Sequence, residues 1–404
     1  MGINKDNDKG IKLLLAIIYP FGAFLYSLRD LKSRSSYWVF FFFILIYGLC
    51  FNAEAYDKFD SSRYLADFLA FSSNAEYNFT SAVSEFFSKD SDVKDIFVYV
   101  LYYLTNILAG NNYHVLFFLV AIVFGYFNLR SLKFITNDSE FKNTAFYYVL
   151  ALIFVFSNSI FNINSIRFWT ASWVAVYATF QVLINDKRSY LLLLLTLPLI
   201  HGSFYIYWIF FVGAYIIRRY YKILPYVFFI SFFFTDVLLM IIPSIEDYLP
   251  PFMQKMVWAY TISEGAQERI AGADLEDVPL YARILTPLPR YFSLLLIFLL
   301  VRSYKNFKDD KSREFLGFIL GYGSLVNISS MVPSMGRYWY ILIPFYVYLW
   351  VHNSSILMKH KQIVLLFPVI ALYALFQVGR NIVWTTDPLL FITNSIHLII
   401  RNLS

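Results

Sequence analysis

Five arginines lie at or near the ends of long apolar stretches, outside the clusters of lysine and arginine in the sequence: Arg63, Arg167, Arg290, Arg337 and Arg380. The guanidinium group is a planar fork that binds phosphate through paired hydrogen bonds. Any one of these arginines is equally well explained by a side chain that reaches the membrane interface or pairs with an acidic loop residue. Five together favour a site that binds the diphosphate group of a lipid.

His201 and Asp60 are the candidates for acid–base chemistry. His201 lies among apolar residues in LPLIHGSFYIYW, where an ionisable side chain indicates a functional site. The alternative is a histidine that bonds to the backbone at a helix break. Asp60 stands out among the loop carboxylates because Arg63 follows three residues later, on the same face of a helix. A histidine or a carboxylate near a sugar hydroxyl can act as a general base.

Aromatic residues beside the candidate arginines could stack on sugar rings. Tyr64, Tyr291 and Tyr338 each follow an arginine directly, and Trp339 comes next. Aromatic residues make up 21% of the chain, so most of them are expected to face lipid or the membrane interface. The histidines are too scattered for a zinc motif, and neither a cysteine pair nor a glycine-rich phosphate loop is present. We therefore expect no cofactor and no metal.

The elements that must position these residues are membrane helices. The chain has 404 residues, of which 59% are hydrophobic and only 15% charged, with a mean hydropathy of +0.57. These values exclude a soluble or disordered protein and predict an all-α polytopic membrane protein, with 1–404 as one integral membrane domain of about 12–13 transmembrane helices. The apolar runs lie at 11–28, 36–53, 113–130, 143–161, 166–185, 223–242, 290–302, 315–332, 337–351 and 362–378.

Charge in the loops orients these helices. The net charge of +6 comes from short basic clusters between apolar runs rather than from one face, which argues against nucleic acid as a partner. Basic clusters remain in the cytoplasm by the positive-inside rule, whereas 53–95 has nine acidic against four basic residues and 243–289 has seven against three. We predict that both acidic segments are periplasmic loops. The cytoplasmic clusters lie at 29–34, 130–142, 187–188, 218–222, 302–313 and 359–361.

Counting crossings between these loops decides two ambiguous segments. The run 96–109 cannot cross alone and is about 21 Å long as a helix, so it is predicted to be an interfacial or re-entrant helix. The segment 189–217 becomes a pair of short helices broken at His201–Gly202, with the break in a cavity rather than in lipid. The same count makes 11–28 a crossing helix and places the N-terminus outside.

One block of the sequence, 162–204, resembles the central signature of the EpsG-type, Wzy-like polysaccharide polymerases. It reads NINSIRFWTASWVAVYATFQVLINDKRSYLLLLLTLPLIHGSF, and the residues that fit are Asn164, Arg167, Ala171, His201 and Ser203. The DSSRY segment at 60–64, PRY at 289–291 and GRY at 336–338 are similar to weaker elements of the same family. Many relatives have glutamine where this chain has Phe168, so no role of that glutamine carries over.

The resemblance implies a metal-independent, GT-C-like glycosyltransferase of the bacterial inner membrane with its active site facing the periplasm. Such enzymes join undecaprenyl-diphosphate-linked oligosaccharide repeat units, donor and acceptor alike, into O-antigen, capsule or exopolysaccharide, in some cases with a chain-length regulator protein as partner. On this basis Asp60 and His201 are expected to be catalytic. Arg63, Arg167, Arg290 and Arg337 would bind diphosphate, and Tyr64, Asn164, Tyr291 and Tyr338 would bind substrate.

Two alternatives remain open from the sequence. An O-antigen-ligase-like or polyprenyl-phosphosugar-dependent GT-C transferase would use a similar arginine set, with Asp57 and Asp60 as paired acids and a required divalent metal. A polysaccharide flippase or exporter would carry cations deep within its spans and repeat symmetry between its halves, and the sequence shows neither feature.

Overall fold

The computed structural model describes the chain as two compact helical units. Unit 1 comprises Met1–Phe180, Ser189–Gly202 and Ala371–Ser404, and unit 2 comprises Gln181–Arg188 and Ser203–Ile370. The described residues are helical apart from turns and an isolated bridge between Phe51 and Thr386, which confirms the predicted all-α class. Those residues are 6, 8–54, 60–73, 79–86, 95–142, 144–235, 237–248, 254, 257–264, 266–267, 288–332, 334–357, 379, 382 and 385–403.

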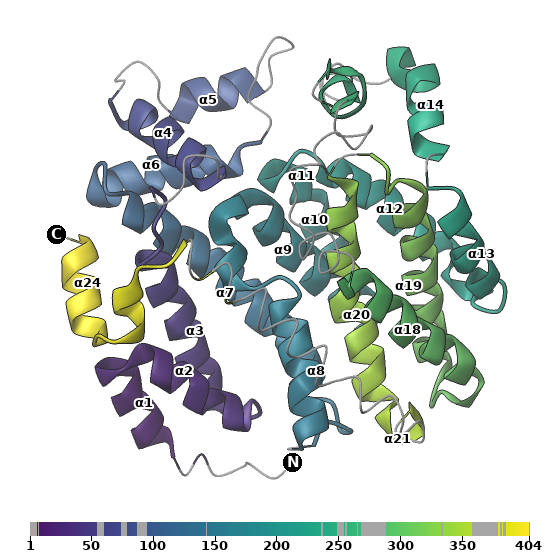
Figure 1. Cartoon of the computed structure of the whole chain (residues 1–404), viewed down its shortest axis with the longest axis horizontal. Helices are drawn as coiled ribbons and strands as arrows, with labels where there is room; N and C mark the ends of the chain where they lie inside the picture. Colours follow the sequence, from purple (N-terminus) through teal and green to yellow (C-terminus); the bar gives the residue numbers. More distant parts are fainter. Residues whose placement is uncertain are drawn as a thin grey trace. The chain divides into compact units, whose positions relative to one another are not determined.

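Unit 1 is built on an antiparallel pair of helices, α3 (Arg34–Leu49) and α7 (Tyr113–Thr136), drawn side by side in Figure 1. Gly48 allows the close approach, because a Cβ atom there would lie 2.7 Å from the carbonyl oxygen of Phe117. At the opposite end, the ammonium group of Lys133 lies 4.0 Å from the ring centre of Tyr37. The remaining long helices of this unit are α8 (Ala145–Phe156) and α9 (Ile166–Leu183), joined through the 3-10 turn η2 (Ile160–Ser165).

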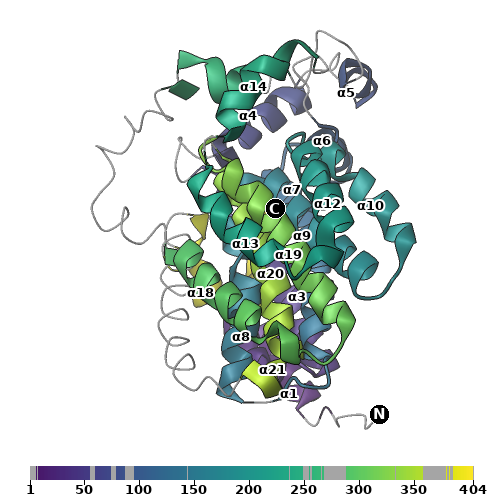
Figure 2. The same ribbon diagram turned by 90° about the vertical axis from the view of Figure 1, so that its right-hand side faces the viewer.

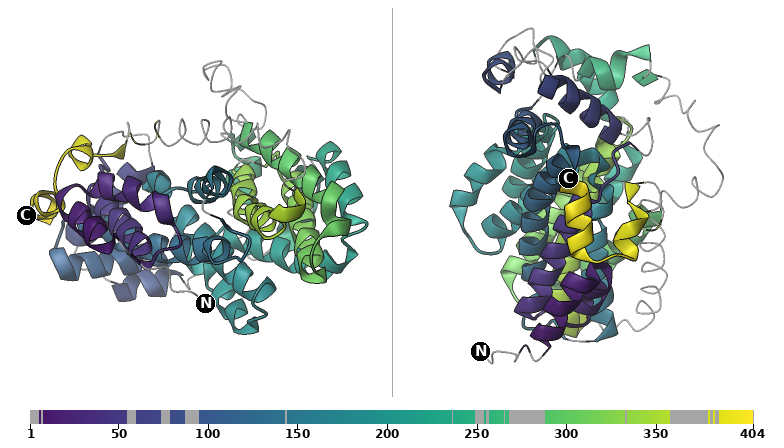
Figure 3. Two further views of the ribbon diagram at one scale, coloured as in Figure 1. Left: turned by 90° about the horizontal axis from the view of Figure 1, so that it is seen from below. Right: turned by 90° about the vertical axis from the view of Figure 1, so that its left-hand side faces the viewer.

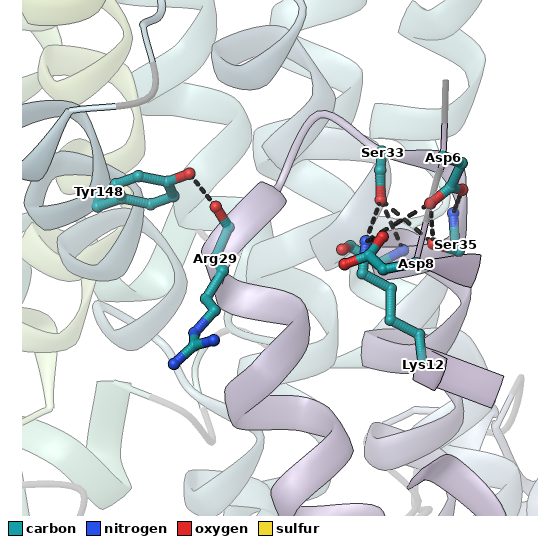
Figure 4. A network of polar contacts seen from close by, with 8 residues as sticks. Asp6, Asp8, Lys12, Arg29, Ser33, Ser35 and Tyr148 are labelled. Atoms are coloured by element: carbon teal, nitrogen blue, oxygen red, sulfur yellow. Dashed lines mark hydrogen bonds and ion pairs between the residues drawn. The ribbon is translucent and has the colours of Figure 1, made fainter. Parts of the chain in front are cut away.

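The predicted crossing helix over 11–28 is wrong. The chain forms two short helices, α1 (Lys9–Ile18) and α2 (Pro20–Ser27), which separate at a proline that cannot continue the backbone ladder of α1. Lys12 Nζ donates to Ser33 Oγ at 2.9 Å, and Ser35 N donates to Asp6 Oδ2 at 2.9 Å (Figure 4). The start of α1 therefore lies beside the start of α3, and the α1–α2 hairpin returns to the end from which it began.

Asp6 and the start of α1 are consequently at the same end of unit 1 as Ser33 and Ser35, whereas counting crossings placed the two ends of 11–28 on opposite sides. Burial of Lys12 is possible because its ammonium group also lies 2.9 Å from Asp8. A fully buried cation needs such partners. The pairing of Lys12 with two acids and one serine could not be seen in the apolar length of the segment.

Short helices cover the Leu49 end of the α3–α7 pair: α4 (Asp60–Ser73), α5 (Phe79–Phe86) and α6 (Phe97–Ala109). The backbone N–H of Ile96 donates to the carbonyl of Leu199, which ties the start of α6 to α11 (Leu197–Ile200), the helix after α10 (Leu191–Leu195). Both the preceding helix α3 and the following helix α7 reach this end. That α6 does not cross a bilayer stays a prediction.

The C-terminal segment closes unit 1. A 3-10 turn, η11 (Pro388–Phe391), leads into α24 (Ser395–Leu403), which lies beside α1 and α3 (Figure 3). Ser395 Oγ donates to the carbonyl of Ala16, and Asn402 Nδ2 contacts Cys50 Sγ at 3.5 Å. With 9 residues, α24 is too short to cross a bilayer.

In unit 2, α19 (Asp310–Ile328) packs against α12 (Phe204–Ile217), α13 (Leu224–Ile230) and α20 (Tyr338–His352), as Figure 2 shows. Gly317 is required here, because a Cβ atom would lie 1.9 Å from the carbonyl oxygen of Arg218. The other described elements are η4 (Arg218–Tyr220), η5 (Ser231–Phe233), α14 (Val237–Ile245), η6 (Glu246–Tyr248), η7 (Trp258–Ile262), α18 (Leu288–Ser303), η9 (Tyr304–Asn306), η10 (Met335–Arg337) and α21 (Ser354–Leu357).

Two of the described helices are long and apolar enough to cross a membrane: Tyr113–Thr136 and the continuous stretch Ala145–Ile163. The predicted number of about 12–13 such helices is therefore not reached within the described part of the chain. The run 223–242 is interrupted after Phe233, where η5 ends, rather than forming one helix. The run 362–378 lies outside the described residues.

Candidate functional site

Arg167, the second residue of α9, is held by two side chains of the acidic segment. Its Nη1 donates to Asp95 Oδ2 at 2.6 Å and its Nε donates to the hydroxyl of Tyr64 at 2.8 Å. The Asp95 side chain is 2% exposed and that of Arg167 is 21% exposed. Among the described residues, the other three N–H groups of this guanidinium have no acceptor. The pairing fixes the plane of the fork and leaves its remaining N–H groups for a ligand.

Tyr64 lies between two guanidinium groups. The centre of its buried ring is 5.3 Å from Cζ of Arg167 and 5.5 Å from Cζ of Arg63, both within the range of a cation–π contact. Burial raises the pKa of the Tyr64 hydroxyl above 10.0, so the phenol stays neutral at pH 7. Arg63 Nη2 in turn lies 3.3 Å from Asp60 Oδ1, with both side chains exposed. Of the residues predicted for the site, four therefore meet here: Asp60, Arg63, Tyr64 and Arg167.

Asp95 is the residue that the sequence analysis missed. It was counted only as one acid among nine in the segment 53–95, although it directly precedes the apolar run 96–109. The sequence analysis gave pairing with an acidic loop residue as an alternative explanation for any single arginine. For Arg167, that acidic residue is Asp95. The signal available in the sequence was the position of Asp95, at the boundary between an acidic loop and an apolar helix. A carboxylate at such a position is buried when the helix lies on the protein.

Asp67 is a second acid of interest on α4. It lies seven residues after Asp60, and therefore on the same face of the helix. Loss of solvation raises the pKa of Asp67 above 3.8, against the opposing charges of Arg63 and Arg167. A carboxyl group with a raised pKa near two arginines can accept a proton in general base catalysis more readily than an unperturbed one.

His201 lies at the predicted break, between α11 and α12. Its backbone is extended, with φ −153°, and its N–H donates to the carbonyl of Leu197. The imidazole ring meets Phe168 edge-on with 5.6 Å between ring centres, and Phe168 adjoins Arg167 in the chain. His201 thus belongs to the same part of unit 1 as Arg167 and Asp95.

Unit 2 carries a second group of candidate residues. Cζ of Arg290 lies 5.2 Å from the ring centre of Phe232 and 5.5 Å from that of Trp339, and Nη2 donates to Asn327 Oδ1 at 3.4 Å. The indole Nε1–H of Trp339 is buried and has no acceptor among the described residues. A cation beside an unpaired buried donor is an arrangement suited to an anionic ligand. Tyr291, next in the chain, is 61% exposed.

Tyr338 is held in the interior rather than presented to a ligand. It is 1% exposed, and its hydroxyl lies 2.7 Å from the carbonyl oxygen of Ser203 and 2.9 Å from its Oγ. Tyr338 therefore joins α20 to the start of α12, and its contact with substrate stays a prediction. Arg337, the last residue of η10, is half-buried.

Three predicted residues are not tested by this geometry. Asp57, Arg380 and the side chain of Asn164 lie outside the described residues. Within the residues that are described, no group of three or more histidine, cysteine or acidic side chains could hold a metal ion.

Comparison with known proteins gives one match. The sequence model of the EpsG family matches residues 35–387. No curated protein matches the chain, and no solved structure does so either. The matched range includes the Arg167 group of unit 1 and the Arg290 group of unit 2.

Proposed function

We propose that this chain, which belongs to the EpsG family, is a membrane glycosyltransferase that joins lipid-diphosphate-linked oligosaccharide repeat units into a polysaccharide. Membership of the family supports a polysaccharide polymerase-like role, and the apolar helices support a membrane protein. The observation that carries the finer proposal is the Arg167 guanidinium, held by buried Asp95 and Tyr64 beside a second arginine, Arg63.

The proposed reaction exchanges one bond at an anomeric carbon. A hydroxyl of the acceptor repeat unit attacks that carbon, the bond to the lipid diphosphate breaks, and the diphosphate leaves with the electron pair. Donors fixed before the reaction stabilise the developing negative charge, by about 3–4 kcal/mol for each well-placed one. Arg63 and Arg167 are the proposed donors in unit 1. Arg290 and Arg337 in unit 2 are proposed, separately, to bind a diphosphate group. The proton of the attacking hydroxyl passes to Asp60 or His201.

Asp95 is the positioning residue in this scheme. Its carboxylate neutralises one charge of the arginine pair but removes the freedom of the Arg167 fork, so that a ligand meets donors in one fixed orientation. Exposed Arg63, whose partner Asp60 is also exposed, then supplies charge that a diphosphate can bind with little rearrangement.

The resemblance to Wzy-like polymerases supports undecaprenyl diphosphate as the lipid and the periplasmic face of the bacterial inner membrane as the place of reaction. The product would be O-antigen, capsule or exopolysaccharide. Donor and acceptor would both be lipid-linked repeat units.

Deletion of the gene tests the proposal. Surface polysaccharide from the deletion strain should run on a gel as single repeat units, and expression of the wild-type chain should restore the ladder. An unchanged ladder in the deletion strain would contradict a polymerase role. Long chains that accumulate on the carrier lipid without reaching their final acceptor would indicate a ligase instead.

A further inference from the structure

A basic hollow in unit 1 lies apart from the candidate site. Its volume is about 390 Å³, and it lies at the Arg34 end of α3 and the Thr136 end of α7. The cations lining it are Lys32, Arg34 and Lys133. The other lining residues are Leu31, Ser33, Tyr37, Trp38, Thr136 and Asn137, so none of the described residues that line the hollow carries a carboxylate.

The charges of this hollow are uncompensated. Lys32 Nζ donates to the carbonyl of Phe141, and Lys133 lies over the ring of Tyr37, but neither forms an ion pair among the described residues. Arg34 is exposed and has no partner among them. Arg34 and Arg130 are close enough to Lys133 to repel its charge. Holding like charges together costs free energy that a bound anion would offset.

A hollow in unit 2 shows the contrasting arrangement. It has a volume of about 360 Å³ and is also lined by basic residues, but carboxylates line it as well. Glu314 lies 3.2 Å from Nε of Arg218 and 3.5 Å from Nε of Arg219, and Lys311 pairs with Asp186. Basic residues around a hollow are therefore not sufficient to indicate an anion site in this protein. The distinguishing feature of the unit 1 hollow is the absence of acids.

We propose that the hollow lined by Lys32, Arg34 and Lys133 binds the phosphate group of an anionic phospholipid. It lies at the end of Tyr113–Thr136, which is long and apolar enough to span a membrane, and hence at the depth of the lipid headgroups. Trp38 lines the hollow and is 51% exposed, as an aromatic side chain at the membrane interface would be. Basic pockets at helix ends bind acidic headgroups through the same combination of charge and apolar surface.

Binding of short-chain lipids to the purified full-length chain in detergent tests this assignment. The probes are dioctanoyl-phosphatidylglycerol, dioctanoyl-phosphatidylcholine and inorganic phosphate. The variant Arg34→Gln/Lys133→Gln should bind the glycerol lipid roughly fivefold more weakly for each charge removed. The matched control, Arg219→Gln/Lys311→Gln, removes the same charge from the paired hollow and should bind as the wild type does.

Each other outcome overturns the proposal. Equal loss in both variants would show general attraction of the lipid to a basic protein. Equal affinity for both lipids would remove the role of charge, and displacement of the lipid by inorganic phosphate would assign the hollow to the free anion. If the double variant does not fold, Arg34→Gln alone serves, because it breaks no contact with a described residue. Unchanged lipid affinity in that variant would also refute the site.

Discussion

The pair formed by Arg167 and Asp95 links the fold of unit 1 to the proposed chemistry. The Asp95 carboxylate is almost fully buried, and the guanidinium of Arg167 compensates its negative charge. The same guanidinium offers its remaining donors to a ligand. A simple truncation of Arg167 therefore removes a proposed phosphate donor and also the ion-pair partner of a buried carboxylate.

Truncation of Arg167 should consequently lower stability as well as activity. Arg167→Ala is expected to cost about 3–5 kcal/mol, the range found when one partner of a buried ion pair is removed. Lys311→Ala, which breaks an exposed pair with Asp186, should cost no more than about 1 kcal/mol. Thermal unfolding of the purified variants in detergent measures the difference.

The double variant Arg167→Gln/Asp95→Asn separates the two effects. It removes both charges while keeping groups that can bond to each other, so it should be more stable than Arg167→Ala. If Arg167 binds diphosphate, the double variant should accumulate in the membrane and yet produce no polymer ladder. Normal polymer from a stable double variant would show that the arginine serves the fold alone.

His201 can be tested by a substitution that keeps hydrogen bonding but cannot titrate. If the imidazole carries a proton in the reaction, His201→Gln should lower turnover by about 10²–10⁴-fold. Substrate binding should change little, because the proton is transferred only during reaction. His397→Gln on α24, where the side chain is exposed, is the matched control and should be without effect. Near-normal polymer from His201→Gln would leave His201 with a positioning or packing role.

At the scale of elements, the sequence predicted single helices well where an apolar run coincides with one helix. The runs 36–53, 113–130 and 166–185 correspond to α3, α7 and α9, because length and hydropathy are local properties. The run 11–28 did not correspond, because it divides at Pro20 and Lys12 reaches Ser33 at the start of α3. Such long-range polar contacts have no signature in hydropathy.

The α1–α2 hairpin predicts that its two ends lie on the same side of the membrane. In a Cys50→Ala background, cysteines introduced at Lys9 and at Arg29 should both be protected from an impermeant reagent added outside intact cells. Both should react after permeabilisation, because both positions are exposed at one end of unit 1. Labelling of position 9 alone in intact cells would restore the crossing helix that the sequence suggested.

The start of α19 predicts a response to acid. Burial raises the pKa of Asp309, but hydrogen bonds from Ser312 and interaction with His352 outweigh it and hold the pKa below 3.8. A lowered carboxyl pKa stabilises the fold above the ordinary value, and this contribution is lost as pH falls through the folded-state value. The unfolding midpoint of wild type should therefore exceed that of Asp309→Asn at pH 7, with the gap closing below about pH 4.

The variant Asp309→Asn separates the effect of the carboxylate charge from the effect of capping the helix. Asn still accepts a hydrogen bond at a helix N-terminus, whereas Asp309→Ala loses the cap and should cost about 1 kcal/mol at every pH. A gap between wild type and Asp309→Asn that does not change with pH would argue against the charge interaction with His352.

At the scale of the whole molecule, the sequence predicts which residues lie close together on one helix, but it does not predict which residues pair between distant segments. Asp60 and Arg63 were expected on one face because they lie three residues apart on a helix. Arg167 and Asp95 are 72 residues apart, and no rule of helix periodicity relates them. The family resemblance covered the stretch that holds both partners, yet its motif contained only the arginine.

The path of the chain across the membrane between α3 and α7 is open to a direct test. We expect 96–109 to remain on the periplasmic side. In a Cys50→Ala background, cysteines at Ser91 and Asn111 should both react with the external reagent. Reaction at only one position would show that this segment crosses.

The position of α24 has a consequence for how the protein is made. Ser395 bonds to Ala16 across a separation of 379 residues, and the Asn402 side chain reaches Cys50 at the end of α3. The ribosome must therefore release nearly all of this chain before the first helices obtain their last neighbours. Until then the faces of α1 and α3 that α24 covers lack this neighbour. Nascent chains stalled before residue 395 should accordingly be cleaved by membrane proteases more readily than chains that include α24.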